Sequence, residues 1–369
     1  MKRAFGVALV VFELCCQAAA DESTELRNKA LAGDASAQLS LGEKYRVGLG
    51  LTADPAEAMR FYKLAAEQDI AEAQFALAEM YRLGEASPPD YQEAVRWYRR
   101  AAEKGLPEAQ FNLGVMYDNG QGVAQDYSEA VRWYRITAEK GMADAEYNLG
   151  LMYALGKGVN QDYQEAARWY RRAAEHRDLP QAEYNLGVLY DRGQGFAADL
   201  QEAARWYRRA AEQGHAEAAF NLALMYAAGQ GVPQDHAEAA RWYQSAAGQG
   251  QPEAQYNLAL LYAEGQGVVR NYSLAARWYR LAAEQGELDA QLNLAALYAG
   301  GKGVAQDYVA SYQWLELAAR AGEPDARKAQ ESIAGKMTSE QIDRARALAG
   351  AWKPCRGKLE CEERVQLRP

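Results

Sequence analysis

The sequence predicts an all-α solenoid built from eight copies of one helix-turn-helix repeat. Three observations support this prediction: aromatic residues recur at a constant spacing, each copy contains two helical patterns, and one copy is too short to bury its apolar face alone. The recurring aromatic residues are 36 residues apart, with one spacing of 37. They are Phe61, Trp97, Trp133, Trp169, Trp206, Trp242, Trp278 and Trp314.

A second set of aligned residues, all tyrosines, fixes the number of repeats. These residues are Tyr45, Tyr81, Tyr117, Tyr153, Tyr190, Tyr226, Tyr262 and Tyr298. They divide the chain into repeats 35–70, 71–106, 107–142, 143–179, 180–215, 216–251, 252–287 and 288–323. The longer spacing falls on His176-Arg177-Asp178, which replaces the Lys-Gly seen at Lys104-Gly105, so one connection is expected to be irregular.

The first helix of a repeat is clearest in residues 107–142. Pro107 suits a helix start, and apolar residues follow at helical spacing through Leu113 to Tyr117. Gly120 and Gly122 then allow a tight connection.

The second helix of the same repeat begins at Asp126. Asp126 and Glu129 predict a reciprocal N-terminal cap, and Arg135 is expected to pair with Glu139 four residues later. Gly141 suits the left-handed turn that ends the helix. The apolar face consists of Ala130, Trp133, Tyr134 and Ala138.

The ends of a solenoid need covers, and the flanking sequence predicts them. Residues 21–34 contain an N-terminal capping helix, and residues 324–352 contain two C-terminal capping helices, the second opened by a capping box at Thr338. Residues 353–369 form a polar tail. Its Cys355 and Cys361 are expected to close a disulfide in an oxidising compartment, because two thiolates alone make a poor zinc site.

The first twenty residues resemble a secretory signal peptide, residues 1–20. Lys2 and Arg3 precede a short apolar run, and three alanines end at Ala20, where cleavage is expected. A second interpretation is lipidation at Cys15 or Cys16, and the sequence does not decide between this lipidation and cleavage after Ala20. No later segment approaches the roughly 20 apolar residues of a spanning helix. We therefore expect an exported protein of the periplasm or, alternatively, a secreted one.

Charge and motif content argue against several functions. The net charge of −9 at pH 7 disfavours a nucleic-acid partner. The three histidines have no metal partner at helical spacing, and His176 and His215 are expected in surface loops. No nucleophile or phosphate-binding motif occurs. The sequence therefore predicts no catalytic residue, no metal, no cofactor and no enzyme.

The repeat follows the string AEAQYNLGxMYxxGxGVxxDYxxAxxWYxxAAxxG, nearly intact in residues 107–142 and 252–287. This string resembles the Sel-1-like repeat family, which is related to the tetratricopeptide repeats. The resemblance covers residues 35–323 and implies a right-handed α/α superhelix that serves as a scaffold or adaptor. Similar exported bacterial proteins act in envelope regulation, exopolysaccharide assembly and host interaction. Cysteine-rich relatives are linked to penicillin binding or β-lactam hydrolysis, but no repeat here contains a cysteine.

The resemblance implies that first helices line a concave groove, where six repeats place an asparagine mid-helix. These candidate partner-binding residues are Asn112, Asn148, Asn185, Asn221, Asn257 and Asn293. Asparagine is a mediocre helix former, so its recurrence needs a reason. An amide ladder can hold an extended segment, or each amide can bond a neighbouring first helix, and the sequence leaves both open.

Second helices carry an arginine before each aromatic residue: Arg60, Arg96, Arg132, Arg168, Arg205, Arg241 and Arg277. Ion pairing or stacking on the aromatic rings explains them, and a basic stripe for sugar acids is the alternative.

These features lead to one hypothesis and two alternatives. The hypothesis is a non-enzymatic scaffold of the bacterial cell envelope that binds a partner protein or extended peptide in the concave groove. The alternatives are an enzyme acting on the cell wall or on β-lactams, and a scaffold for envelope polysaccharide machinery.

Overall fold

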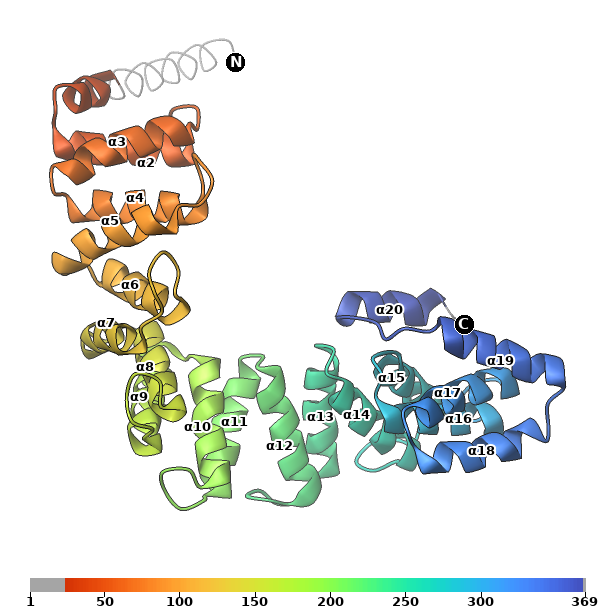
Figure 1. Ribbon diagram of the computed structural model, residues 1–369. Helices are drawn as coiled ribbons and strands as arrows, with labels where there is room; N and C mark the ends of the chain where they lie inside the picture. Colours follow the sequence, from red (N-terminus) through yellow and green to blue (C-terminus); the bar gives the residue numbers. More distant parts are fainter. Residues whose placement is uncertain (1–23, 368–369) are drawn as a thin grey trace, which may run out of the picture. The chain divides into compact units, whose positions relative to one another are not determined.

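The computed structural model describes residues 24–367, and this part of the chain contains helices and no β-strand. Helices follow one another in antiparallel pairs, one pair per repeat (Figure 1). The pairs are α2 Ala35–Val47 and α3 Pro55–Glu67, α4 Ala71–Leu83 and α5 Tyr91–Glu103, α6 Pro107–Asn119 and α7 Tyr127–Glu139, α8 Ala143–Leu155 and α9 Tyr163–Arg177, α10 Pro180–Arg192 and α11 Leu200–Glu212, α12 Ala216–Ala228 and α13 His236–Ala247, α14 Pro252–Glu264 and α15 Tyr272–Glu284, α16 Leu288–Gly300 and α17 Tyr308–Arg320. The all-α repeat fold is confirmed.

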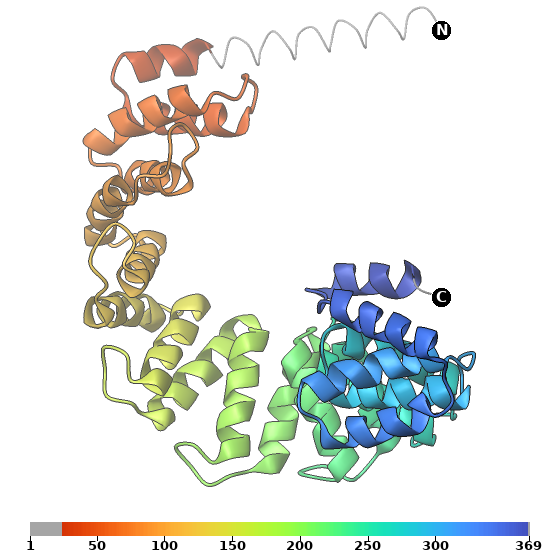
Figure 2. The same cartoon turned by 45° about the vertical axis from the view of Figure 1, so that its right-hand side comes forward.

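The chain divides into two compact units between Arg177 and Asp178. Unit 1 contains α2 to α9, and unit 2 contains α10 to α20. The division falls on the connection that the 37-residue spacing marks as irregular. There α9 extends to 15 residues, and Asp178 takes a positive φ of 41°. Within each unit, every repeat helix packs on its pair partner, and consecutive pairs stack (Figure 2).

The core of a repeat is formed by small residues that admit one large ring. Tyr134 of α7 is buried against Gly114 of α6, where a Cβ would lie 2.9 Å from the tyrosine ring. Ala130 and Leu113 are fully buried beside it. The small residues therefore let the two helices of a pair pack closely around the ring.

The second helices are capped, but the predicted reciprocal bond is wrong. Asp126 Oδ1 accepts from the backbone N–H groups of Ser128 and Glu129, at 2.9 and 3.1 Å. The N–H of Asp126 itself donates to the carbonyl of Tyr117 at 3.0 Å, so it does not need the Glu129 carboxylate. That carboxylate pairs instead with Arg132 at 3.2 Å.

This one-way cap makes a prediction about stability. Asp199→Ala should lower the free energy of unfolding by about 1 kcal/mol, because two N–H groups of α11 lose their acceptor. Glu202→Ala should cost no more than about 0.5 kcal/mol, because it removes only an exposed pair with Arg205. Urea unfolding of both variants measures the difference. Equal losses in the free energy of unfolding would indicate that Glu202 takes part in the cap after all.

The predicted pair of Arg135 and Glu139 is also wrong. Arg135 donates to the hydroxyl of Tyr153 in the next repeat, at 2.8 Å. Arg99 binds Tyr117 in the same way, also at 2.8 Å. An exposed ion pair between residues four apart in a helix stabilises by only a few tenths of a kcal/mol. The hydrogen bond to the tyrosine of the next repeat therefore forms instead of the Arg135–Glu139 pair.

Capping helices occupy both ends, as the sequence predicts. A helix over residues 24–31 precedes α2. After α17 come α18 Pro324–Ala334 and α19 Ser339–Ala351, and α19 packs on α17. Thr338 and Gln341 form the expected capping box. Within the described residues, no helix combines the length and apolarity needed to cross a membrane.

The tail is not merely a polar extension. It forms a further helix, α20 Lys358–Leu367, which packs on α15. Cys355 and Cys361 form the predicted disulfide, with Cα atoms 5.4 Å apart, and both are buried against Leu281. The N–H of Cys355 donates to the carbonyl of Glu284 at 2.8 Å, so the tail is bonded to the end of α15.

Glu284 anchors the tail with its side chain as well. Its carboxylate is buried, accepts from the indole of Trp352 at 3.0 Å and pairs with Arg364 at 3.4 Å. The corresponding Glu139 and Glu212 in other repeats are exposed. Repeat 252–287 therefore differs from the others in carrying the tail on its second helix.

Candidate functional site

The six predicted asparagines lie on the first helices α6, α8, α10, α12, α14 and α16, and all are half-buried. Asn112 Nδ2 donates to Glu79 Oε1 of the preceding first helix at 3.0 Å, and lies 3.4 Å from the hydroxyl of Tyr98. Asn221 contacts the hydroxyls of Tyr184 and Tyr207. These asparagines therefore bond inside the array, as one of the two interpretations requires.

Two further asparagines bond tyrosines, and one bonds its own helix. Asn148 bonds the hydroxyl of buried Tyr134, and Asn293 bonds Tyr256. Asn257 Nδ2 donates to the carbonyl of Glu253 at 2.8 Å. Asn185 is half-buried at the same position of α10. Four of the six amides thus contact a neighbouring helix, and part of each asparagine side chain stays accessible.

The tyrosines that receive these bonds are neutral groups of the core. Burial raises the pKa of Tyr134 and Tyr207 well above the ordinary value. Their hydroxyls donate to Asp118 at 3.3 Å and to Asp191 at 3.2 Å. Each hydroxyl can therefore donate to the carboxylate and accept from an asparagine.

Aromatic and aliphatic residues flank the asparagines. Phe111 and Tyr147 tilt against the buried tyrosines Tyr134 and Tyr170, with ring centroids 5.8 and 5.9 Å apart, so they belong largely to the core. Aliphatic residues lie one helical turn after the aromatic ones, and Leu224 is 42% exposed. We call the asparagines and these aliphatic residues the Asn face; the aliphatic members are Val115, Leu151, Val188, Leu224 and Leu260.

A buried polar position was missed from the sequence. Two residues before the asparagine, five of the six repeats place a glutamine or glutamate, and the first two repeats do so at the same position; the remaining repeat, 216–251, has Ala219 there. The polar members are Gln38, Gln74, Gln110, Glu146, Glu183, Gln255 and Gln291. Gln110 Nε2 donates to the carbonyl of Ala102 at 3.0 Å, and its Oε1 accepts from Lys140 at 3.0 Å. The position therefore connects consecutive second helices.

The two glutamates at this position need arginines. Glu146 pairs with Arg172 at 2.9 Å, and Glu183 pairs with Arg209 at 2.8 Å; both carboxylates are fully buried. Burial raises the pKa of Glu183, and the Arg209 guanidinium opposes this rise. Each arginine follows its glutamate by 26 residues in the sequence. This shared spacing is the signal from which the two buried ion pairs could have been predicted.

The arginines of the second helices are paired or stacked, as expected. Six of the seven bind the glutamate three residues earlier, at 2.9 to 3.5 Å: Arg60, Arg96, Arg132, Arg168, Arg205 and Arg241. Arg132 also lies 5.2 Å from the ring centroid of Trp133, and Arg241 lies 4.9 Å from that of Trp242. Arg277 differs, because Leu274 replaces the glutamate.

The histidines are not simple surface-loop residues. His176 lies in the last turn of α9, with Nδ1 2.9 Å from buried Glu146. His215 caps α12 and stacks on Tyr184 with ring centroids 4.6 Å apart, and burial lowers its pKa. Across residues 24–367, no group of three or more His, Cys, Asp or Glu side chains is placed to hold a metal ion.

The fold and these contacts define a helical repeat protein of the α-solenoid class. The Sel1 repeat model matches residues 35–70, 71–106, 107–142, 143–178, 180–215, 216–251, 252–287 and 288–323. The chain belongs to the Sel1 repeat family.

Solved structures agree with this assignment. A Sel1 repeat protein from Oxalobacter formigenes is 33% identical, with a TM-score of 0.67, over 84% of this chain and 89% of that one. A protective antigen present in uropathogenic Escherichia coli strains, which displays an SLR fold, is 29% identical, with a TM-score of 0.56, over 94% and 97% of the two chains. No curated protein sequence matches significantly. Sel1 repeat proteins are generally scaffolds for protein–protein interaction, and the repeat fold is typically non-catalytic.

Proposed function

We propose that this protein is an exported scaffold of the bacterial cell envelope that holds an extended segment of a partner protein on the Asn face of unit 2. The observation that carries the proposal is the position of the asparagines. Asn221, Asn257 and Asn293 are half-exposed on successive first helices, and Asn221 and Asn293 touch the first helix before their own. The asparagines therefore recur at one position of the successive first helices α12, α14 and α16.

The chemistry of this face suits a peptide backbone. An amide has both donors and an acceptor, and the bond that Asn257 makes to Glu253 uses only Nδ2. Its Oδ1 can accept from a backbone N–H. Packed helices lie about 8–10 Å apart and an extended chain rises about 3.3 Å per residue, so about three residues join successive asparagines. Leu224 adds an exposed apolar contact between them.

Export is supported by two features of the chain. The signal-like residues 1–20 lie outside the described residues, and the proposal takes them as the signal that is removed after Ala20. The Cys355–Cys361 disulfide suits an oxidising compartment. Intact mass of the protein recovered from a periplasmic fraction is expected to correspond to a chain that begins at Asp21. A cytosolic chain that begins at Met1 would contradict export.

The binding test uses peptides selected from a displayed random dodecapeptide library on the purified mature protein. A selected peptide should lose at least about tenfold in affinity when Asn221, Asn257 and Asn293 are changed to alanine, because one amide contact is worth about 1 kcal/mol.

The matched control changes Tyr243 and Tyr279 to phenylalanine. It removes two hydroxyls from buried tyrosines beside the face and keeps the Tyr207 hydroxyl that Asn221 contacts. Peptide affinity should stay within about twofold of the original protein, a change below about 0.5 kcal/mol. If both variants lose affinity equally, or if no peptide is selected, the asparagines serve only the internal packing.

A further inference from the structure

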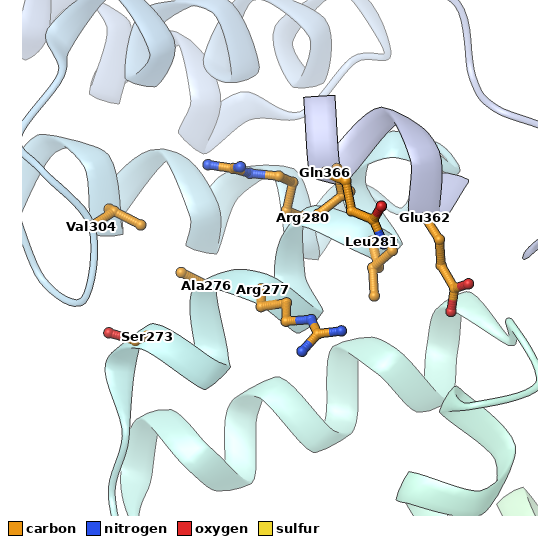
Figure 3. Close-up of a pocket in the computed structure, with 9 residues that line it drawn as sticks. Ser273, Ala276, Arg277, Arg280, Leu281, Val304, Glu362 and Gln366 are labelled. Atoms are coloured by element: carbon orange, nitrogen blue, oxygen red, sulfur yellow. The ribbon is translucent and has the colours of Figure 1, made fainter. Parts of the chain in front are cut away.

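A pocket of about 490 Å³ lies between α15 and the tail helix α20, on second-helix and tail residues instead of on the Asn face (Figure 3). Arg277 and Leu281 line it from α15, and Val304 lines it from the connection before α17. Glu362 and Val365 line the opposite wall from α20. The pocket thus exists only where the tail covers a repeat.

Arg277 is the only one of the seven aligned arginines that has no glutamate three residues earlier. Its six counterparts bind a glutamate three residues earlier, but repeat 252–287 has Leu274 there. Arg277 makes no hydrogen bond, ion pair or ring contact within the described residues. Its guanidinium keeps all five N–H donors available at the pocket.

The other polar groups of the α15 wall are already engaged. Arg280 donates to the hydroxyl of Tyr298 and lies over that ring, and its guanidinium points away from Arg277 (Figure 3). Ser273 Oγ donates to the carbonyl of Gly303 at 3.0 Å, which holds the connection that carries Val304. Among the described α15 residues of the pocket, Arg277 therefore provides the unpaired charge.

Glu362 supplies the opposite charge from α20. It has no ion pair or hydrogen bond in the described part of the chain, and it does not reach Arg277. Leu281 lies between the two charges (Figure 3), and Val304 and Val365 add apolar lining to the pocket. A ligand that pairs with both Arg277 and Glu362 carries a carboxylate at one end and an ammonium at the other, with small apolar groups that contact the apolar lining of the pocket.

We propose that this pocket binds a short peptide with free ends, its carboxylate on Arg277 and its ammonium on Glu362. Arginine binds carboxylates through two parallel N–H bonds, which makes Arg277 the stronger anchor. A dipeptide is the smallest peptide that carries both a free carboxylate and a free ammonium, so it is the simplest ligand of this class. The site is separate from the Asn face, so it stands or falls independently of the proposed function.

Titration calorimetry of the mature protein with L-alanyl-L-alanine tests the proposal. Binding is expected in the original protein, and Arg277→Ala and Glu362→Gln should each weaken it by at least about tenfold, as expected for a charge-assisted contact. Arg241→Ala is the matched control. Arg241 occupies the same repeat position two helices earlier, but it pairs with Glu238 and lies outside the pocket. This control should keep the original affinity.

Analogues with one charge removed test the ligand class. N-acetyl-alanyl-alanine and alanyl-alanine amide should each bind at least about tenfold more weakly than the free dipeptide. No measurable binding of the dipeptide, or equal affinity for Arg277→Ala and Arg241→Ala, would overturn the site. Equal affinity for the acetylated analogue would overturn the role of Glu362.

Discussion

Arg209→Ala is expected to destabilise unit 2 by about 3 kcal/mol at pH 7, because it leaves a buried carboxylate without its cation. Glu183 is fully buried and pairs with Arg209 at 2.8 Å, and Gln213 gives it a further bond at 2.6 Å. The Gln213 amide cannot neutralise the charge. Urea unfolding of the variant at pH 7 measures the loss.

The loss should depend on pH with a definite sign. Burial raises the pKa of Glu183 in the folded protein above its value in the unfolded chain. Such a group favours folding at pH values below its unfolded pKa, and this contribution disappears as the pH rises through the folded pKa. Removing Arg209 raises the folded pKa further, so the destabilisation should shrink as the solution is made more acidic.

Two controls separate charge from packing. Glu183→Gln in the Arg209→Ala background should recover most of the stability, because glutamine occupies this position in repeats such as the one containing Gln110. Arg205→Ala removes an exposed arginine of the same helix and should cost at most about 0.5 kcal/mol. A loss that is independent of pH and persists with Glu183→Gln would assign the effect to the contact of Arg209 with Trp206.

The repeat fold could be predicted because its information is local and recurrent. The aromatic spacing identified Trp133 and Trp169, which the structure buries, and the glycine spacing placed the helix ends. The reciprocal cap could not be predicted correctly, since the competing acceptor for the Asp126 N–H is the carbonyl of Tyr117 on the preceding helix. A carbonyl is present in every residue and leaves no trace in the sequence.

The sequence predicted where the asparagines of the candidate site lie, but only some of the contacts that they make. The asparagines are half-exposed on first helices, as expected, but their tyrosine partners depend on how consecutive pairs stack. The tail shows the same limit: its polar composition predicted no helix, yet α20 forms where the disulfide, Trp352 and Arg364 bring it onto α15. Contacts between residues 68 to 80 positions apart decide that segment.

Gly231→Ala is expected to be as damaging as the loss of many core side chains, although it adds one methyl group. Gly231 has φ of 69°, and a Cβ there would lie 2.2 Å from the carbonyl oxygen of Leu200 in the preceding repeat. The left-handed backbone costs about 1 kcal/mol for alanine. Overpacking adds about 1–3 kcal/mol, and the clash with backbone favours the upper part of that range.

Gly214→Ala provides the matched comparison within unit 2. Gly214 also has a positive φ, of 89°, but nothing lies within 4 Å of its Cβ position. It should therefore lose only the conformational term of about 1 kcal/mol. Urea unfolding gives the difference, and hydrogen exchange should show the Gly231→Ala defect in α11 and α12, which flank the contact. Similar losses for the two variants would mean that the second glycine of each connection serves its own turn and not the stacking of repeats.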